Sequence, residues 1–224
     1  MKVTAILLDY QRHTFTDRVI ENITERAGYP FELIRVDRKG ISAAINQGIY
    51  EASDSDAVVT LANDIIMPDQ WLAQMVYHLE RIPETGTCGF HTVESIGGLT
   101  NRGGLDVHEW PVAFGNIIIP RNTIDKVGYF NNDFDPYGTQ DADYAKRCTM
   151  AGLIHYYIQG SRAEHIGHDV GDGSDYRKMK DEGLSKAGEK ALHWNHYYEQ
   201  TGNFYIPYEQ EDTLIQMQQY YGES

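Results

Sequence analysis

The sequence contains few cysteines and no long apolar run. Cys88 and Cys148 are the only cysteines among 224 residues. Neither has a CxxC partner, so we expect two buried thiols rather than a disulfide or a zinc site. No stretch reaches the roughly 18 apolar residues of a membrane-spanning helix, and the apolar run 3–8 is too short for a signal peptide. We therefore expect a cytoplasmic protein, with peripheral contact to a membrane left open.

Positive charge is also scarce. The chain has 19 Lys and Arg against 33 Asp and Glu, a net charge of -14. Nucleic-acid affinity depends largely on Lys and Arg at the phosphates, so this balance argues against a nucleic-acid partner. Carboxylates gathered with histidine in a cleft would instead suit a divalent cation. The hydrophobic content of 41% is enough for one ordinary packed core.

The first part of the chain alternates between strand and helix patterns. Strands are expected at 3–8, 31–36 and 57–61, and helices at 16–27, 41–52 and 68–79. Thr16 is expected to cap the first helix, Gly28 to end it, and Pro68 to lie in the first turn of the third. This order predicts an α/β fold with a mixed, mostly parallel sheet flanked by helices.

The pattern changes after about residue 81. Strands are expected at 87–92, 114–119 and 154–158, and a helix at 140–151. The Gly-rich stretch 95–112 is expected to be a substrate-binding loop. The stretch 167–188, rich in Gly, Asp and Lys, is expected to be a mobile lid. Residues 189–224 are expected to form a helical, aromatic extension packed on the domain.

Polar residues follow several of the predicted strands. Ligands of open α/β sheets bind at the carboxyl ends of the strands, so these residues are the candidates for a site. They are Asp9, Tyr10, Asp37, Asn63, Asp64 and His165. Structural alternatives remain open: Asp64 as a helix-capping acid, Asp37 as a turn former and Tyr10 as a packing residue.

The stretch from Asn46 to Pro68 carries a family resemblance. Asn46-Gln47-Gly48 within a helix, Asp64 after the next strand and Pro68 beyond it resemble the donor half of family 2 glycosyltransferases, whose fold is called GT-A. The resemblance implies that Asp64 binds Mg²⁺ or Mn²⁺ as the last acid of a DxD-type motif. Ala62 stands where that motif has its first acid. The donor-binding residues that follow from the resemblance are Asp9, Tyr10, Asp37 and Asn63.

The segment 130–144, FNNDFDPYGTQDADY, resembles the acceptor half of the same family. There a glycine-led acidic motif opens a helix and an arginine follows, which implies that Asp141 is the general base. Gln140 replaces the usual Glu. Asp141 and Asp143 are about 200° apart around a helix, so we expect one in the cleft and the other solvated or structural. An acceptor contact of Asp143 is the weaker expectation.

The late segment 163–168, AEHIGH, resembles the His-x-Gly segment that completes the metal site in this family. His165 fits the ligand position better than His168, which remains a phosphate or metal contact. Arg102, in a Gly-rich stretch, is expected to meet the donor phosphates or else to be an exposed loop residue. Trp110 and Tyr137 are expected to stack on the acceptor sugar or to pack in the core.

The resemblance covers roughly residues 1–170 and implies an inverting, hexosyltransferase-like enzyme. Asp141 would take the proton from an acceptor hydroxyl, and Mn²⁺ or Mg²⁺ at Asp64 and His165 would neutralise the nucleoside diphosphate leaving group. A UDP-sugar is the favoured donor and a glycan the favoured acceptor. We expect a GT-A domain at 1–185, with a donor half at 1–92 and an acceptor half at 93–185, followed by the extension at 189–224.

Other functions fit the same residues. A non-catalytic protein that binds a nucleotide-sugar or a glycan on this fold remains the main alternative, because a fold does not determine a function. A glycosidase would also use two carboxylates, but strand-end acids suit a nucleotide and a metal better. A nucleotidyltransferase would need a Gly-rich basic loop after the first strand, and residues 9–13 do not supply one.

Overall fold

A computed structural model describes residues 1–10, 13–92, 98–109, 115–167 and 175–222. Its main sheet has the strand order β2-β1-β3-β8-β5-β9-β7-β6. The strands are β1 (Val3–Leu8), β2 (Glu32–Val36), β3 (Ala57–Ala62), β5 (Thr85–His91), β6 (Thr100–Arg102), β7 (Leu105–Glu109), β8 (Asn116–Pro120) and β9 (Ile154–Arg162). β2, β1, β3, β5 and β9 run in one direction, so the prediction of a mixed, mostly parallel sheet is confirmed.

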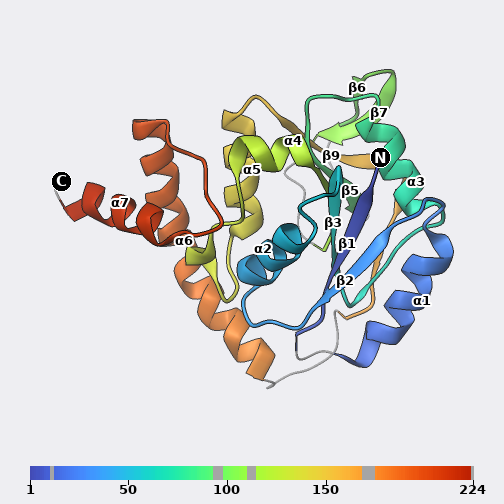
Figure 1. The fold of residues 1–224 in the computed structure, drawn as a ribbon, viewed down its shortest axis with the longest axis horizontal. Coiled ribbons are helices and arrows are strands. Elements are labelled where there is room, and N and C mark those ends of the chain that lie inside the picture. The colour runs from blue at the N-terminus through green and yellow to red at the C-terminus, as the bar shows by residue number, and fades with distance from the viewer. Residues whose placement is uncertain (11–12, 93–97, 110–114, 168–174, 223–224) are drawn as a thin grey trace.

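Helices cover both faces of this sheet (Figure 1). They are α1 (Thr16–Arg26), α2 (Ile41–Glu51), α3 (Trp71–Leu79), α4 (Arg121–Val127), α5 (Gln140–Met150), α6 (Asp175–Thr201) and α7 (Glu211–Gly222), with short 3-10 turns η1 (His13–Phe15) and η2 (Asn132–Phe134). One core forms beneath α1 and α3, and a second beneath α2, α4 and α5. α6 and α7 pack on the outside through a third, aromatic cluster. No helix in the described ranges is long and apolar enough to cross a membrane.

The helix ends differ from expectation at two points. Thr16 does not cap α1, because its hydroxyl donates to the buried Asp9 carboxylate at 2.5 Å. Pro68 lies before α3 rather than in its first turn, since the helix begins only at Trp71. Gly28 follows the end of α1 with φ +64°, as predicted, in a conformation that glycine adopts without strain.

Two predicted loops contain regular structure. The stretch 95–112 includes the hairpin β6–β7, because β7 pairs with β9 and extends the sheet. In the expected lid 167–188, residues 168–174 lie outside the described residues, whereas the part from Asp175 onward belongs to α6. α6 continues through 185–189, so the expected boundary between domain and extension lies within one helix.

α2 joins the donor half of the chain to segment 130–135. The Asn46 side chain donates to the Phe130 carbonyl and accepts from the Phe130 backbone N–H, both at 2.8 Å. Two residues along, Gly48 packs so closely on β1 that an added Cβ would overlap the Ile6 side chain. The Asn46-Gln47-Gly48 motif therefore has a structural purpose: one residue holds segment 130–135 and the other lets α2 approach the sheet.

Replacing Gly48 tests this close approach. We expect Gly48→Ala to lower the free energy of unfolding by about 1–3 kcal/mol, the usual cost of overpacking a core. Gly188→Ala is the matched control, because Gly188 also lies in a helix but has open space around its Cα. It should be neutral or raise stability by about 0.5–1 kcal/mol through helix propensity. Equal urea midpoints for the two variants would contradict the packing argument.

Candidate active site

Asp64 and His165 meet at the carboxyl edge of the sheet. β4 (Ile65–Ile66) pairs antiparallel with β10 (Glu164–His165), which sets His165 opposite Ile65. The His165 Nε2 atom lies 3.2 Å from Asp64 Oδ2. The Ile166 N–H also donates to the Asp64 carbonyl at 2.9 Å. The small sheet thus brings together two predicted metal ligands that are 101 positions apart in the sequence.

A small pocket of about 90 Å³ lies beside Asp64, where β1, β2 and β3 end and α2 begins. Its lining residues are Leu8, Asp9, Tyr10, Val36, Arg38, Gly40, Ile41, Ala44, Ala62, Asn63 and Asp64. The predicted donor contacts Asp9, Tyr10 and Asn63 and the predicted metal ligand Asp64 are therefore neighbours in space. Asp37 is exposed at the end of β2 and is not among the lining residues. Arg38 lines the pocket instead, and the sequence analysis missed it.

Asp9 holds the pocket wall together. Its side chain is only about 2% exposed and accepts hydrogen bonds from Thr16 Oγ1 at 2.5 Å and from Asn63 Nδ2 at 3.0 Å. The Arg35 guanidinium donates to its second oxygen. A buried carboxylate needs such partners to stay ionised. Asp9 thus fixes Asn63, and through it the turn that carries Asp64.

Asp143 lies in a buried ion pair. Its residue is 4% exposed, Arg147 Nε donates to one carboxylate oxygen and the Tyr198 hydroxyl donates to the other, both at 2.9 Å. Arg147 also donates to the Val127 and Tyr129 carbonyls. Since both oxygens of Asp143 are occupied inside the protein, an acceptor contact is not supported. The expectation that one of the two helical acids is structural agrees with this geometry.

Asp141 occupies the first turn of α5 in a different environment. Its Oδ1 accepts from the Ala142 N–H at 2.8 Å. Burial raises the pKa of Asp141, and the backbone N–H groups only partly offset this effect. Burial also raises the pKa of Tyr137, with further increases from the negative charges of Asp141 and Asp64. Tyr137 therefore lies within electrostatic range of both acids.

The loop 135–139 that precedes Asp141 is held on two sides. The Asp135 carboxylate accepts from the Ser42 N–H at 2.8 Å and the Ala43 N–H at 3.0 Å, which caps α2 from across the chain. On the other side, Gly183 of α6 packs so tightly on the Tyr137 carbonyl that a Cβ would overlap it. Asp135 and Gly183 are positioning residues that the sequence analysis missed, because neither contact leaves a local pattern.

Gln140, the departure from the family pattern, also supports this loop. Its Oε1 accepts from the Gly138 N–H at 2.8 Å, and the residue is buried. A glutamate would accept the same hydrogen bond but would bring a second negative charge next to Asp141. The Gln140 amide therefore preserves the hydrogen bond to Gly138 without placing a second negative charge beside Asp141.

Arg102 lies in another part of the described structure. Arg102 pairs with Glu109 and has Glu84 as a further acidic neighbour. Glu84 directly precedes β5, whereas Asp64 follows β3, and because these strands are parallel the two acids lie at opposite edges of the sheet. The structure thus places Arg102 with Glu109 and Glu84 and not among the residues that line the pocket beside Asp64. Trp110 and His168 lie outside the described residues.

Comparison with known proteins identifies the family. The family model described as glycosyl transferase family 2 matches residues 14–184. This chain belongs to glycosyltransferase family 2. No curated protein sequence matches it significantly.

Solved structures show the GT-A fold at low sequence identity. GalNAc-T7 with UDP, GalNAc and Mn²⁺ superposes with a TM-score of 0.67 at 12% identity, covering 99% of this chain but 54% of that one. A Drosophila β1,4-galactosyltransferase 7 catalytic domain with xylobiose gives 0.56 at 16%, covering 80% and 79%. The Pyrobaculum calidifontis mannosyltransferase with GDP-Man and Mn²⁺ gives 0.56 at 16%, covering 76% and 58%. This chain thus spans about half the length of GalNAc-T7.

The contrast between Asp143 and Asp141 predicts different stability effects. Asp143→Asn leaves Arg147 buried without its counter-charge, so we expect a loss of about 3–5 kcal/mol in the free energy of unfolding. Asp141→Asn keeps the size and the hydrogen bond to Ala142, and should change stability by less than about 1 kcal/mol. Urea unfolding of both variants measures the difference. Equal losses would mean that the Asp143–Arg147 pair does not stabilise the fold.

Proposed function

We propose that this protein is a metal-dependent, inverting glycosyltransferase that transfers a sugar from a nucleoside-diphosphate sugar, preferably a UDP-sugar, to a hydroxyl of a glycan acceptor. The observation that carries the proposal is the approach of His165 to Asp64 beside a strand-end pocket. Membership of glycosyltransferase family 2 supports sugar transfer. UDP with Mn²⁺ in GalNAc-T7 and GDP-Man with Mn²⁺ in the mannosyltransferase support a nucleotide donor and a divalent cation.

The residues at the pocket edge fit Mn²⁺ or Mg²⁺. Asp64 offers carboxylate oxygen, which both ions accept, and His165 offers an imidazole nitrogen, which suits Mn²⁺ better than Mg²⁺. In the described part of the chain no group of three or more His, Cys, Asp or Glu gathers in one place. The donor diphosphate and water would therefore supply the remaining ligands. When bound, the cation supplies positive charge that stabilises the departing diphosphate.

Asp141 is proposed to act as the base. In an inverting transfer, the acceptor hydroxyl attacks the anomeric carbon from the face opposite the leaving group, and Asp141 accepts its proton at a carboxylate oxygen. Two features of its environment support this role. Burial raises its pKa, which makes the carboxylate a stronger proton acceptor. Tyr137, whose pKa is raised by the charges of both Asp141 and Asp64, offers a ring and a hydroxyl to position the sugar.

Tyr10 and Arg38 are proposed to contact the nucleotide. Both line the pocket next to Asp64, and Tyr10 is only partly buried. An accessible aromatic ring suits a base, and a guanidinium suits a phosphate or ribose. Asp37 remains a proposal as a ribose or base contact, because it is exposed one residue before Arg38.

A non-catalytic nucleotide-sugar or glycan binding protein is the second candidate, and Ala62 is the feature that favours it. Ala62 lines the pocket where the family motif places another acid, so the cation has one protein carboxylate fewer. Hydrolysis of UDP-sugars with Mn²⁺ and without acceptor separates the two functions. An enzyme releases UDP slowly, whereas a binding protein retains the intact donor.

Removing Asp64 should abolish cation-dependent donor binding. We expect Asp64→Ala to weaken UDP affinity in Mn²⁺ by about 100-fold or more, and His165→Ala by about 10–100-fold, because each removes a ligand or its partner. Calorimetric titration with UDP, in Mn²⁺ and in EDTA, measures this loss. The control is Asp69→Ala, an exposed acid in the same connection. Unchanged affinity in Asp64→Ala would exclude this residue from the donor site.

Asp141→Asn should lower turnover by about 10²-fold or more, because the amide cannot accept the proton, while donor affinity stays nearly unchanged. Only the ionised Asp141 acts as a base, so wild-type activity is present above its folded pKa and declines as pH falls through it. Because burial raises that pKa, the decline should begin above the ordinary Asp value of about 3.9.

Initial rates across pH with a glycan acceptor measure both effects. Asp125→Asn, an exposed acid of α4, serves as the control variant. An Asp141→Asn enzyme with wild-type turnover would assign the base to another residue.

A further inference from the structure

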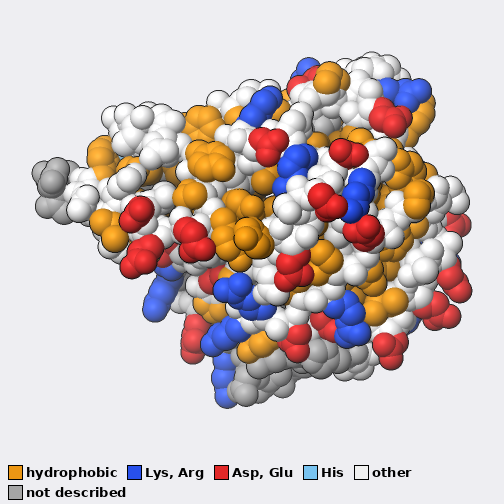
Figure 2. All heavy atoms as spheres, viewed as in Figure 1, with side chains coloured by type: hydrophobic (Ala, Val, Ile, Leu, Met, Phe, Trp, Pro, Cys, Tyr) orange, Lys and Arg blue, Asp and Glu red, His pale blue; other side chains and the backbone are white. Residues whose placement is uncertain are grey.

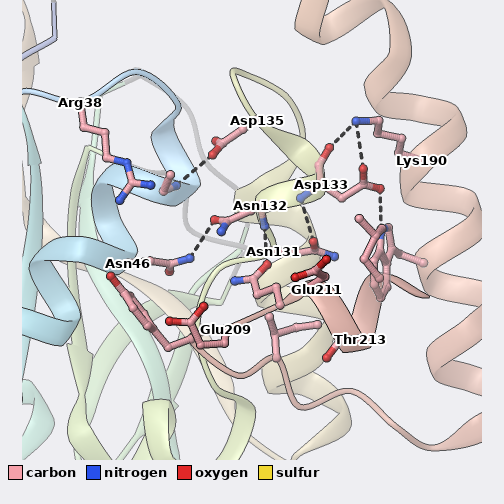
Figure 3. Close-up of a pocket in the computed structure, with 16 residues that line it drawn as sticks. Arg38, Asn46, Asn131, Asn132, Asp133, Asp135, Lys190, Glu209, Glu211 and Thr213 are labelled. Carbon is pink, nitrogen blue, oxygen red and sulfur yellow. Dashed lines mark hydrogen bonds and ion pairs between the residues drawn. The ribbon is translucent and has the colours of Figure 1, made fainter. Parts of the chain in front are cut away.

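A second and larger cavity lies where the C-terminal segment packs on α2 and segment 131–135 (Figure 3). Its volume is about 660 Å³, within the range of small-molecule sites. α2 contributes Asn46, segment 131–135 contributes the opposite wall, and α6 and the start of α7 close the remaining side. Arg38 lines this cavity and also the pocket beside Asp64. The two sites are therefore adjacent.

Hydrogen bonds hold the walls of this cavity in place. Trp194 Nε1 donates to Asp133 Oδ2 at 2.9 Å, and Lys190 Nζ lies 3.2 Å from Asp133 Oδ1. The Asn132 N–H donates to Gln210 Oε1 at 2.8 Å. Because these wall residues are held before a ligand binds, little conformational entropy would be lost in ordering them. The cavity is thus a formed site rather than a gap between helices.

The charges around this cavity disfavour an anionic ligand. Arg38 and Lys190 are positive, whereas Asp133, Asp135, Glu209 and Glu211 are negative, which leaves a net charge of about -2. Glu209 and Glu211 line the cavity and are exposed. Carboxylates are acceptors only, so they suit a ligand with many hydroxyl donors and no phosphate.

An aromatic surface adjoins the polar cavity. Tyr208 lines it and stacks on Tyr50, with ring centroids 4.5 Å apart and an interplanar angle of 21°. Tyr129 contacts Tyr208 edge-on, with ring centroids 5.2 Å apart. Tyr50 is 57% exposed. Figure 2 shows hydrophobic side chains gathered in the middle of this face, with charged groups around them.

We propose that this cavity binds a neutral saccharide chain, as the site for the non-reacting part of a glycan acceptor. A saccharide presents hydroxyls that carboxylates and amides can bind, and an apolar ring face that packs on tyrosine. The assignment to the acceptor rests on the proposed function, and the adjacency through Arg38 supports it. Saccharide binding itself depends only on this cavity.

Binding of neutral oligosaccharides tests the proposal without donor or metal. The probes are pentasaccharides of glucose, xylose, mannose and N-acetylglucosamine, observed by saturation-transfer NMR and titrated by calorimetry. We expect at least one to bind. Tyr208→Ala and Glu209→Gln should each weaken that binding by about tenfold, equal to one stacking contact or one strong hydrogen bond. Tyr77→Ala and Glu80→Gln, on the exposed surface around the end of α3, are matched controls that should bind normally.

A parallel titration with UDP and Mn²⁺ separates this proposal from the proposed function. Asp64→Ala should lose UDP binding and retain saccharide binding, whereas Tyr208→Ala should do the reverse. If no pentasaccharide binds the wild-type protein, or if binding survives both cavity variants, the cavity proposal is wrong even when UDP binds. If saccharide binds and UDP does not, the donor assignment fails instead.

Discussion

The attachment of α2 to segment 130–135 is the constraint on which the site depends. Asn46 holds Phe130 with two hydrogen bonds, and Asp135 caps α2 through the Ser42 and Ala43 N–H groups. One end of α2 lines the strand-end pocket, and segment 130–135 leads directly into Asp141. The spacing between the pocket and Asp141 therefore rests on hydrogen bonds between α2 and segment 130–135, which hold it more closely than a flexible loop would.

The C-terminal helices support the same attachment from outside. Tyr198 of α6 donates to Asp143, Lys190 pairs with Asp133, and Gly183 packs against the Tyr137 loop. These contacts spread over more than four turns of one helix, so α6 acts as a brace along α5 and segment 130–138. The tail is therefore part of the structure that positions Asp141, and it also forms a wall of the larger cavity.

The fold followed largely from local patterns, whereas the site depended on the family resemblance. The helical spacing from Ile41 to Ala52 and the apolar run 57–61 are local signals, and both elements form where expected. The contact between Asp64 and His165 depends on the pairing of two short strands, and the two residues are 101 positions apart. The local periodicity of the sequence cannot predict such a contact. The ion pair of Arg102 with Glu109 was not foreseen for a similar reason, since it lies in a hairpin whose place is set by the long-range pairing of β7 with β9.

The two acids at the start of α5 show how packing divides one local motif into separate roles. A helix sets Asp141 and Asp143 about 200° apart, so the two side chains lie in different surroundings. Asp143 faces Arg147 and Tyr198, which occupy both of its oxygens and keep it from any ligand. Asp141 has a raised pKa and lies within electrostatic range of Tyr137, without a hydrogen bond from a cationic side chain in the described ranges. A buried, ion-paired carboxyl and a carboxyl without a cationic partner can take different roles, even when they are neighbours in one helix. The two-residue spacing predicts that the two side chains lie on different faces of α5. The contact of Tyr198 of α6 with Asp143 shows which of the two acids is held inside the protein.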